Sequence, residues 1–342
     1  MHLARPLVLG VCGGIGAGKT LRCEHLTRMF AGRRLPLPAP NGGRSVRVTS
    51  TKYISADIEG HEVLRSAAVR ISPITDYEHE VDAEHDTADE LVKARGLIVT
   101  PPGERSSWIA HLVVDQNPNA VSQQDRDDAW MLLSGLDRYF GFNNVFHPAM
   151  GDGGGNGSST REFEVNRKSL SALVFSDVTQ LQTLNSLTWP LIARRVQRCI
   201  ESITELPQQP AADDRGSGRD ASADVSAPLV VLEAALLVEM RALLDLCDAC
   251  LLVDTDEDTA VRRLRMRNGL EREEALRRVR AQCSMTARAE DLREYTNARP
   301  GGVVPPHAFV TTSDSVELSD ALRSFELVAE EVIVKAFLAR GV

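Results

Sequence analysis

The sequence predicts an α/β fold in which helices cover both faces of a parallel sheet. Apolar runs typical of strands alternate along the chain with stretches that have helical spacing. Two of these runs, "PLVVLEAALLVE" and "CDACLLVDTD", are apolar almost throughout, as expected for strands buried on both faces. A glycine-rich segment near the start joins the first strand to the first helix. This order of elements is typical of a doubly wound sheet.

The first strand, "PLVLGVC", leads into the glycine-rich segment, and "LRCEHLTRMF" follows it with helical spacing. The segment fits the pattern G-x-x-x-x-G-K-[ST], in which successive backbone N–H groups curl around a polyphosphate. Lys19 can bridge the terminal phosphates and the Thr20 hydroxyl can ligate Mg²⁺. The fold is therefore expected to be that of a P-loop NTPase. The predicted nucleotide-binding residues are Gly13, Gly14, Ile15, Gly16, Ala17, Gly18, Lys19 and Thr20.

The later elements follow in the same alternation. "KYISAD" predicts a short strand that ends in a carboxylate. "VTQLQTLNSLTWPLIARRVQRCIESI" predicts a helix in which Pro190 marks a kink or a new start. After the two apolar strands, "DEDTAVRRLRMRNGLEREEALRRVRAQ" predicts one helix, a break at Gly269 and a second, highly charged helix.

Other segments lack this pattern. The stretch 207–227 has almost no large apolar side chain and is expected to be disordered. The acidic stretch from Thr75 to Gly135 is expected to form an extra helical excursion. His79 and His85 lie there among carboxylates, and a solvated acidic helix explains them better than a metal site does.

Composition excludes several classes of protein. The 342 residues are 43% hydrophobic and carry a net charge of −9, which argues against nonspecific binding of nucleic acid or anionic membranes. No apolar run approaches the roughly 20 residues of a membrane span. A cleaved presequence would remove the strand before the glycine-rich loop, so a cytosolic location is expected. Cys247-Asp-Ala-Cys250 has no second pair, and we expect core residues there.

The class of P-loop protein depends on the remaining motifs. "DIEG", from Asp57 to Gly60, matches the D-x-x-G of GTPases, but the Asn-Lys-x-Asp that reads guanine is absent. Glu233 follows an apolar run without the neighbouring acid expected of a motor or AAA-type ATPase. A small-molecule kinase needs a carboxylate near the terminal phosphate, arginines and a closing lid. Asp57 lies just beyond a strand end, and the arginine-rich helical pair resembles a lid.

Several blocks, in this order, resemble the dephospho-CoA kinase family. That family begins with a loop like "GGIGAGKT". Its D-A-D strand end is similar to "ISADIEGHEVL", where Asp57 takes the second acid and Ser55 replaces the first. Its acceptor region resembles "YFGF" and "VNRKSLSALVFSDVTQLQTLNSLTWPLI". There Arg167 matches an arginine, and Trp189-Pro190 stands at a His-Pro pair.

The resemblance continues in the second half. "AALLVE" is similar to the family's P-L-L-x-E strand, keeping Glu239 while Ala235 replaces the proline. The lid block matches as far as Arg267 and Gln282, and "HAFVTTSDSVELSDALRSF" resembles the last strand and helix. "TNARPGGVVPPH" interrupts the family's final A-D-x-V-I segment.

The resemblance implies ATP-dependent phosphorylation of the ribose 3′-hydroxyl of 3′-dephospho-CoA, giving CoA and ADP. On the donor side, the loop and Lys19 would bind the β- and γ-phosphates, Thr20 would bind Mg²⁺, and Asp57 would accept or orient the proton of the acceptor hydroxyl.

On the acceptor side, the resemblance implies that Arg267 swings in with the lid and stabilises the transferring phosphoryl group. Arg167 would contact the acceptor's phosphates. Glu239 would help to hold the acceptor pocket or merely pair with an arginine. Two alternatives stay open: another small-molecule kinase on the same frame, and a nucleotide-binding protein without catalysis that uses its acidic insertions to bind a partner.

These assignments divide a single domain, 1–342, into parts. The predicted parts are a core (5–31, 46–65, 228–260 and 307–340), an acceptor-binding helical region (139–205), a lid (261–290) and insertions (32–45, 75–135, 150–160, 207–227 and 296–306).

Overall fold

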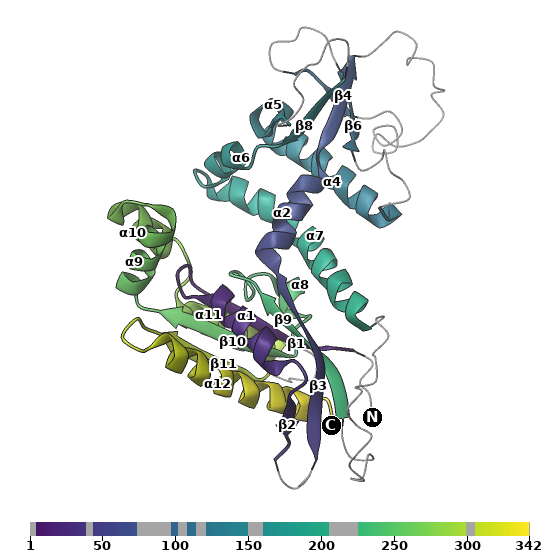
Figure 1. Cartoon of the computed structure of the whole chain (residues 1–342). Helices are drawn as coiled ribbons and strands as arrows, with labels where there is room; N and C mark the ends of the chain where they lie inside the picture. Colours follow the sequence, from purple (N-terminus) through teal and green to yellow (C-terminus); the bar gives the residue numbers. More distant parts are fainter. Residues whose placement is uncertain are drawn as a thin grey trace. The chain divides into compact units, whose positions relative to one another are not determined.

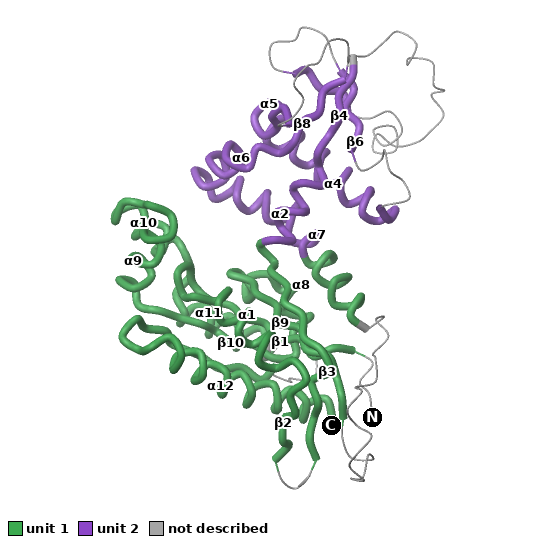
Figure 2. Tube along the Cα trace, viewed as in Figure 1, with its two compact units in different colours: residues 1–57, 193–342 green, residues 58–192 purple. Residues whose placement is uncertain are grey.

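The computed structural model of the chain describes residues 5–38, 44–73, 97–101, 108–113, 121–149, 160–204, 225–298 and 305–341. The chain forms two compact units, residues 1–57 with 193–342 and residues 58–192 (Figure 2). The helix α2 (Ala56–Ser66) and the helix α7 (Val178–Thr204) each begin in one unit and end in the other. The single domain with its acceptor region and lid stays a prediction of the sequence.

The first unit contains a six-stranded sheet in the order β11-β10-β1-β9-β3-β2. Its strands pair in parallel, except that β2 runs antiparallel to β3. The strands are β1 (Leu7–Gly13), β2 (Arg34–Pro36), β3 (Ser45–Ser55), β9 (Val225–Glu233), β10 (Ala249–Thr255) and β11 (His307–Thr312). The predicted α/β fold with a mostly parallel, helix-flanked sheet is confirmed (Figure 1).

Two long helices cover one face of this sheet. α1 (Lys19–Phe30) and α12 (Leu318–Ala339) place Leu26, Phe30, Phe325 and Phe337 in one core cluster with the strands. All four side chains are fully buried, and apolar burial of this kind is the main favourable term in folding. Besides the parts of α2 and α7 that belong to it, this unit contains α8 (Arg241–Leu244), α9 (Glu257–Asn268), α10 (Arg272–Arg280) and α11 (Met285–Ala298).

The second unit has an antiparallel five-stranded sheet in the order β5-β6-β4-β8-β7. Its strands are β4 (Val69–Pro73), β5 (Leu97–Val99), β6 (Trp108–Leu112), β7 (Phe146–Pro148) and β8 (Arg161–Val165). The helices α4 (Gln123–Phe140), α5 (Phe142–Val145) and α6 (Arg167–Val174) accompany them. Phe142 stacks on Phe146 with ring centroids 4.5 Å apart, which joins α5 to the sheet.

The second sheet corrects two expectations. The stretch 75–135 was expected to be a helical excursion, yet it contains β5 and β6 in addition to α4. The region 139–205 was expected to be helical, yet it contains β7 and β8. These strands have only three to five residues each, too few to show a clear alternating pattern. His79 and His85 lie outside the described residues.

Three element boundaries also differ from expectation. β3 has 11 residues and is not short, because its first half pairs with the start of β9. β9 begins at Val225, inside the stretch expected to be disordered, and ends at Glu233, so "AALLVE" forms a turn and not a strand. Pro190 was expected to mark a kink or a new start. It lies inside α7, which continues through it, so it does not start a new helix, and the kink stays a prediction.

Candidate functional site

The glycine-rich loop connects β1 to α1, as its motif predicts. A Cβ atom on Gly13 would lie 2.1 Å from the carbonyl oxygen of Val253 on β10, so only glycine fits this close approach. Gly18 has φ of 72°, a left-handed conformation, and α1 begins directly after it at Lys19. The loop therefore ends at a helix N-terminus, where backbone N–H groups and the helix dipole favour phosphate.

Lys19 is nearly buried at the base of the loop, with 9% of its surface exposed. Its Nζ donates a hydrogen bond to the carbonyl oxygen of Gly14 at 2.9 Å. Burial lowers the pKa of Lys19, and the negative charges of Glu233 and Asp57 partly oppose that change. The two carboxylates therefore lie within electrostatic reach of the ammonium group that the motif assigns to phosphate.

Asp57 lies in the first turn of α2, two residues beyond the end of β3, and its side chain is exposed. β3 pairs with β9 so that Ser55 lies opposite Glu233, and on the other side of β9 Glu233 lies opposite Val11 of β1. The structure thus gathers Asp57 and Glu233 with Lys19 at the carboxyl edge of the sheet, where ligands of open α/β sheets bind.

Glu233 is a site residue that sequence reasoning missed. Its side chain is buried, Oε1 accepts a hydrogen bond from the hydroxyl of Thr20 at 2.9 Å, and Oε2 accepts one from the hydroxyl of Tyr53. This bond and burial raise the pKa of Tyr53 above its usual range, burial being the larger cause. The sequence carries a signal for this residue, an acid at the end of an apolar strand, but the neighbouring acid that marks such a position in motor and AAA-type ATPases is absent.

The donor atoms at this position suit a small hard cation. A threonine hydroxyl and a carboxylate are oxygen ligands of the kind that Mg²⁺ takes, usually one or two from protein beside substrate phosphates and water. Among the residues that the structure describes, no group of three or more His, Cys, Asp or Glu could hold a metal by itself. The pair Thr20–Glu233 fits a magnesium ion that arrives with a nucleotide.

Two arginines support the outer side of the loop. Arg22, also buried, donates to the carbonyl oxygen of Gly18 at 3.1 Å. Arg263 of α9 donates to the carbonyl oxygen of Gly16 at 2.8 Å and also pairs with Asp314. With its carbonyl groups held from outside, the loop keeps a fixed curvature.

The helical pair predicted as a lid is present as α9 and α10, separated at Gly269. Gly269 adopts φ of 65° in the helix-ending position that favours glycine. Arg267 is exposed in the last turn of α9, and its Nε donates to the Oδ1 of its neighbour Asn268 at 2.9 Å. Among the described residues, no hydrogen bond or ion pair joins Arg267 to the phosphate loop.

Glu239 lies in the turn after β9 and pairs with a residue that the sequence did not single out. Arg288 of α11 donates through Nε to Oε1 of Glu239 at 3.2 Å, and the Arg288 side chain is 1% exposed. Within the described part of the chain, Oε2 of Glu239 and Nη2 of Arg288 are buried without hydrogen-bond partners. Of the two roles left open for Glu239, pairing with an arginine is the one seen here.

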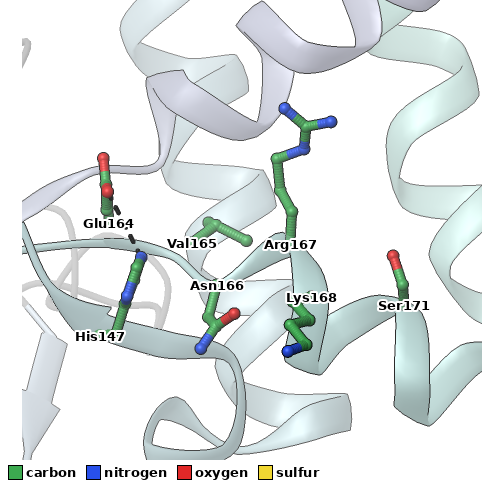
Figure 3. A pocket seen from close by; sticks show the side chains of 7 residues that line it. All are labelled: His147, Glu164, Val165, Asn166, Arg167, Lys168 and Ser171. Carbon is green, nitrogen blue, oxygen red and sulfur yellow. Dashed lines mark ion pairs between the residues drawn. The ribbon is translucent and has the colours of Figure 1, made fainter. Parts of the chain in front are cut away.

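Arg167 belongs to the second unit, in the first turn of α6. It lines a pocket of about 480 Å³ together with His147, Glu164, Asn166 and Lys168 (Figure 3). Nη2 of Arg167 donates to Nε2 of His61 at 2.7 Å, and His147 lies 3.3 Å from Glu164. The pocket therefore presents the cationic side chains of Arg167 and Lys168. Its carboxylate, that of Glu164, lies beside His147.

The structure also tests the predictions about the cysteines and about membrane-spanning helices. Cys247 and Cys250 are buried and free, as expected of core residues. Burial raises the pKa of Cys247, after a larger contribution from its hydrogen bond with Cys250. Of the helices in the described residues, none combines the length and apolar character that crossing a membrane requires.

Comparisons with known proteins confirm the resemblance to dephospho-CoA kinases. The family model described as dephospho-CoA kinase matches residues 217–293, which include β9, β10 and the helical pair. The curated dephospho-CoA kinase of Geobacter sulfurreducens is 32% identical over 135 residues, which are 40% of this chain and 58% of that protein. That of Carboxydothermus hydrogenoformans is 31% identical over 123 residues, or 36% and 50%. The chain thus spans between half and three fifths of the length of these relatives.

Two solved structures are similar to this chain along its length. The crystal structure of TT1252 from Thermus thermophilus has a TM-score of 0.45 and 19% identity, covering 96% of this chain and 98% of that one. The dephospho-CoA kinase from Campylobacter jejuni has a TM-score of 0.34 and 13% identity, covering 95% and 96%.

Proposed function

We propose that this protein is an ATP-dependent kinase that phosphorylates the ribose 3′-hydroxyl of 3′-dephospho-CoA, giving CoA and ADP. The observation that supports it most is the grouping of Lys19, Thr20, Glu233 and Asp57 at one sheet edge. That edge supplies a phosphate cradle, a pair of magnesium ligands and one exposed carboxylate. The match of the dephospho-CoA kinase model over residues 217–293 supports the choice of acceptor.

The proposed mechanism assigns one step to each donor-side residue. The loop and Lys19 hold the β- and γ-phosphates of ATP. Thr20 and Glu233 would hold Mg²⁺, which when bound neutralises charge on the phosphates. Asp57 takes the proton of the 3′-hydroxyl while that oxygen bonds to the γ-phosphorus and the bond to the ADP oxygen breaks. The exposure of the Asp57 carboxylate and its electrostatic influence on the buried Lys19 support this assignment.

The acceptor side carries two further assignments. Arg167 contacts the phosphates of the acceptor, since it lines a pocket whose other cation is Lys168. Arg267 reaches the transferring phosphoryl group only when the helical pair closes, because it is exposed and bonded to its neighbour in this structure. A cytosolic location and an acceptor that is a small molecule complete the proposal.

The test of this function is phosphoryl transfer by purified protein from ATP to 3′-dephospho-CoA, compared with a panel of nucleosides, nucleotides and small metabolites. Only dephospho-CoA is expected to saturate at micromolar levels. Saturation by another acceptor would favour a different small-molecule kinase. ATP binding without transfer to any acceptor would favour a nucleotide-binding protein that lacks catalysis.

Asp57→Asn tests the proposed base. General bases contribute about 10²-fold or more, so turnover should fall by that factor while ATP affinity changes little. Glu62→Gln on the same helix is the matched control. Glu62 pairs with Arg65 one turn away and has no role in the proposed mechanism, so this substitution should leave turnover unchanged. Near-normal turnover of the Asp57→Asn protein would show that Asp57 is not the general base.

A further inference from the structure

The tip of the phosphate loop is attached to the helical pair α9–α10 by three different contacts. The Ile15 side chain packs against the small apolar cluster of the pair, formed by Val261, Leu264 and Ala275. Arg263 donates to the carbonyl oxygen of Gly16 at 2.8 Å. The loop tip and the helical pair therefore share one set of packing and hydrogen-bond contacts.

The third contact involves Gln282, the second residue after α10. Its Oε1 accepts a hydrogen bond from the backbone N–H of Ile15 at 2.7 Å. The carbonyl group of the same peptide, that of Gly14, accepts from Lys19 Nζ at 2.9 Å. One peptide group therefore separates Gln282 from the lysine that the motif directs to the β- and γ-phosphates.

This contact fixes which way the Gln282 amide faces. A backbone N–H can donate only to the oxygen of a glutamine side chain, so the Nε2 amino group must face away from Ile15. Gln282 is half-buried, and within the described part of the chain Nε2 makes no hydrogen bond. The backbone N–H of Ile15 thus orients the Gln282 side chain, whose Nε2 amino group carries two N–H donors.

We propose that Gln282 is an additional phosphate-binding residue, whose Nε2 donates to the terminal phosphate of the bound nucleoside triphosphate. In this arrangement the N–H of Ile15 does not bind the phosphate directly. It orients the Gln282 side chain, which does. Gln282 follows α10, so the same side chain would contact both the terminal phosphate and the loop. Binding of a nucleoside triphosphate would therefore stabilise the packing of the helical pair against the loop. The inference rests on the nucleotide-binding half of the proposed function and needs no particular acceptor.

The test compares two substitutions by calorimetric titration of the full chain with ATP and with ADP, each with Mg²⁺. Gln282→Met keeps the length but removes both polar groups. Gln282→Glu keeps the acceptor for Ile15 and replaces the donor with a negative oxygen. A hydrogen bond to a charged group is worth about tenfold or more in affinity. We expect Gln282→Met to lower the affinity for ATP by about that factor and Gln282→Glu to lower it further. Both substitutions should change the affinity for ADP less.

A purely structural role for Gln282 gives the opposite pattern. The Gln282→Glu protein would then bind ATP as tightly as the natural protein does. Gln282→Met would lower the affinities for ATP and ADP equally. Either result overturns the proposal. Cys283→Ser, at the exposed neighbouring position, is the control and should change neither affinity. If the natural chain bound no ATP, this inference and the proposed kinase would both fail. Normal ATP binding without transfer to dephospho-CoA would overturn only the proposed kinase.

Discussion

Thr20 and Glu233 are joined by a hydrogen bond of 2.9 Å, although 213 positions separate them in the sequence. Thr20 stands at the start of α1 and Glu233 at the end of β9, the strand next to β1. β1 and β9 are parallel, so both end at the same edge of the sheet. The helix that follows β1 starts at this edge, and Thr20 therefore lies beside the last residue of β9. This pair defines the end of the site at which we place Mg²⁺.

Glu233→Gln is expected to lower turnover at least tenfold and to raise the Mg²⁺ concentration needed for half-maximal rate. An amide keeps the hydrogen bond from Thr20 but is a weaker ligand for a hard cation than a carboxylate. The measurement is initial rate against Mg²⁺ concentration. Tyr53→Phe removes the other hydrogen bond to Glu233 without removing a ligand, so it should shift that dependence much less. Equal behaviour of the two variants would contradict a metal role for Glu233.

Gly13→Ala is expected to unfold the loop or prevent folding, whereas Gly14→Ala is expected to be tolerated. A Cβ on Gly13 would lie 2.1 Å from the backbone oxygen of Val253, which cannot move without breaking the pairing of β1 with β10. Of the described residues, the one atom that a Cβ on Gly14 would approach is Oε1 of Gln282 at 3.6 Å, an ordinary contact. Melting temperatures of the two variants check this prediction, and similar values for both would contradict it.

Glu239→Gln is expected to destabilise the fold, while Arg167→Ala is expected to leave stability unchanged and raise KM for the acceptor. Removing the charge that pairs with the 1% exposed Arg288 leaves a buried cation unpaired, at a cost of about 3–5 kcal/mol. Arg167 is exposed in its pocket, so its loss costs the fold little. Urea unfolding measures the change in stability, and acceptor titrations measure the change in KM. If Glu239→Gln kept normal stability but raised KM, the prediction would be contradicted and a role for Glu239 in the acceptor pocket would be favoured.

The stability supplied by Glu326 is expected to disappear at acid pH. Burial raises the pKa of Glu326, but hydrogen bonds from Arg33 and His25 more than offset it, so the pKa lies below the usual value. A carboxylate with a lowered pKa stabilises the fold above its unfolded pKa, near 4.3, and loses that contribution as the pH falls through its folded pKa. Glu326→Gln should therefore cost about 2 kcal/mol at pH 7 and less at an acid pH, because the charge is lost as the pH falls through the lowered pKa.

Urea unfolding at both pH values measures this difference. Glu331→Gln provides the control, since Glu331 forms an exposed pair with Lys335 and should matter little at either pH. A Glu326→Gln penalty that persisted at acid pH would show that packing, and not charge, is responsible.

Much of the first unit could be predicted because its signals are contiguous in the chain. The loop from Gly13 to Thr20, the apolar strands and the break at Gly269 each depend on a few neighbouring residues. The second sheet could not be predicted, because its strands are short and separated by long connections. Glu233 was visible as a strand-end acid, but its importance depends on Thr20 and Tyr53, which meet it only in the fold.

The sequence by itself determined the phosphate loop, the order of strands and helices around it, and the resemblance to dephospho-CoA kinases. Each of these depends on local spacing, which a linear chain displays directly. Only the tertiary structure decided that Glu233 meets Thr20, that Arg288 pairs with Glu239, and that Gln282 meets Ile15 from 267 positions away. Such contacts depend on which strands become neighbours and on where each helix returns to the sheet, and no short stretch of sequence contains that information.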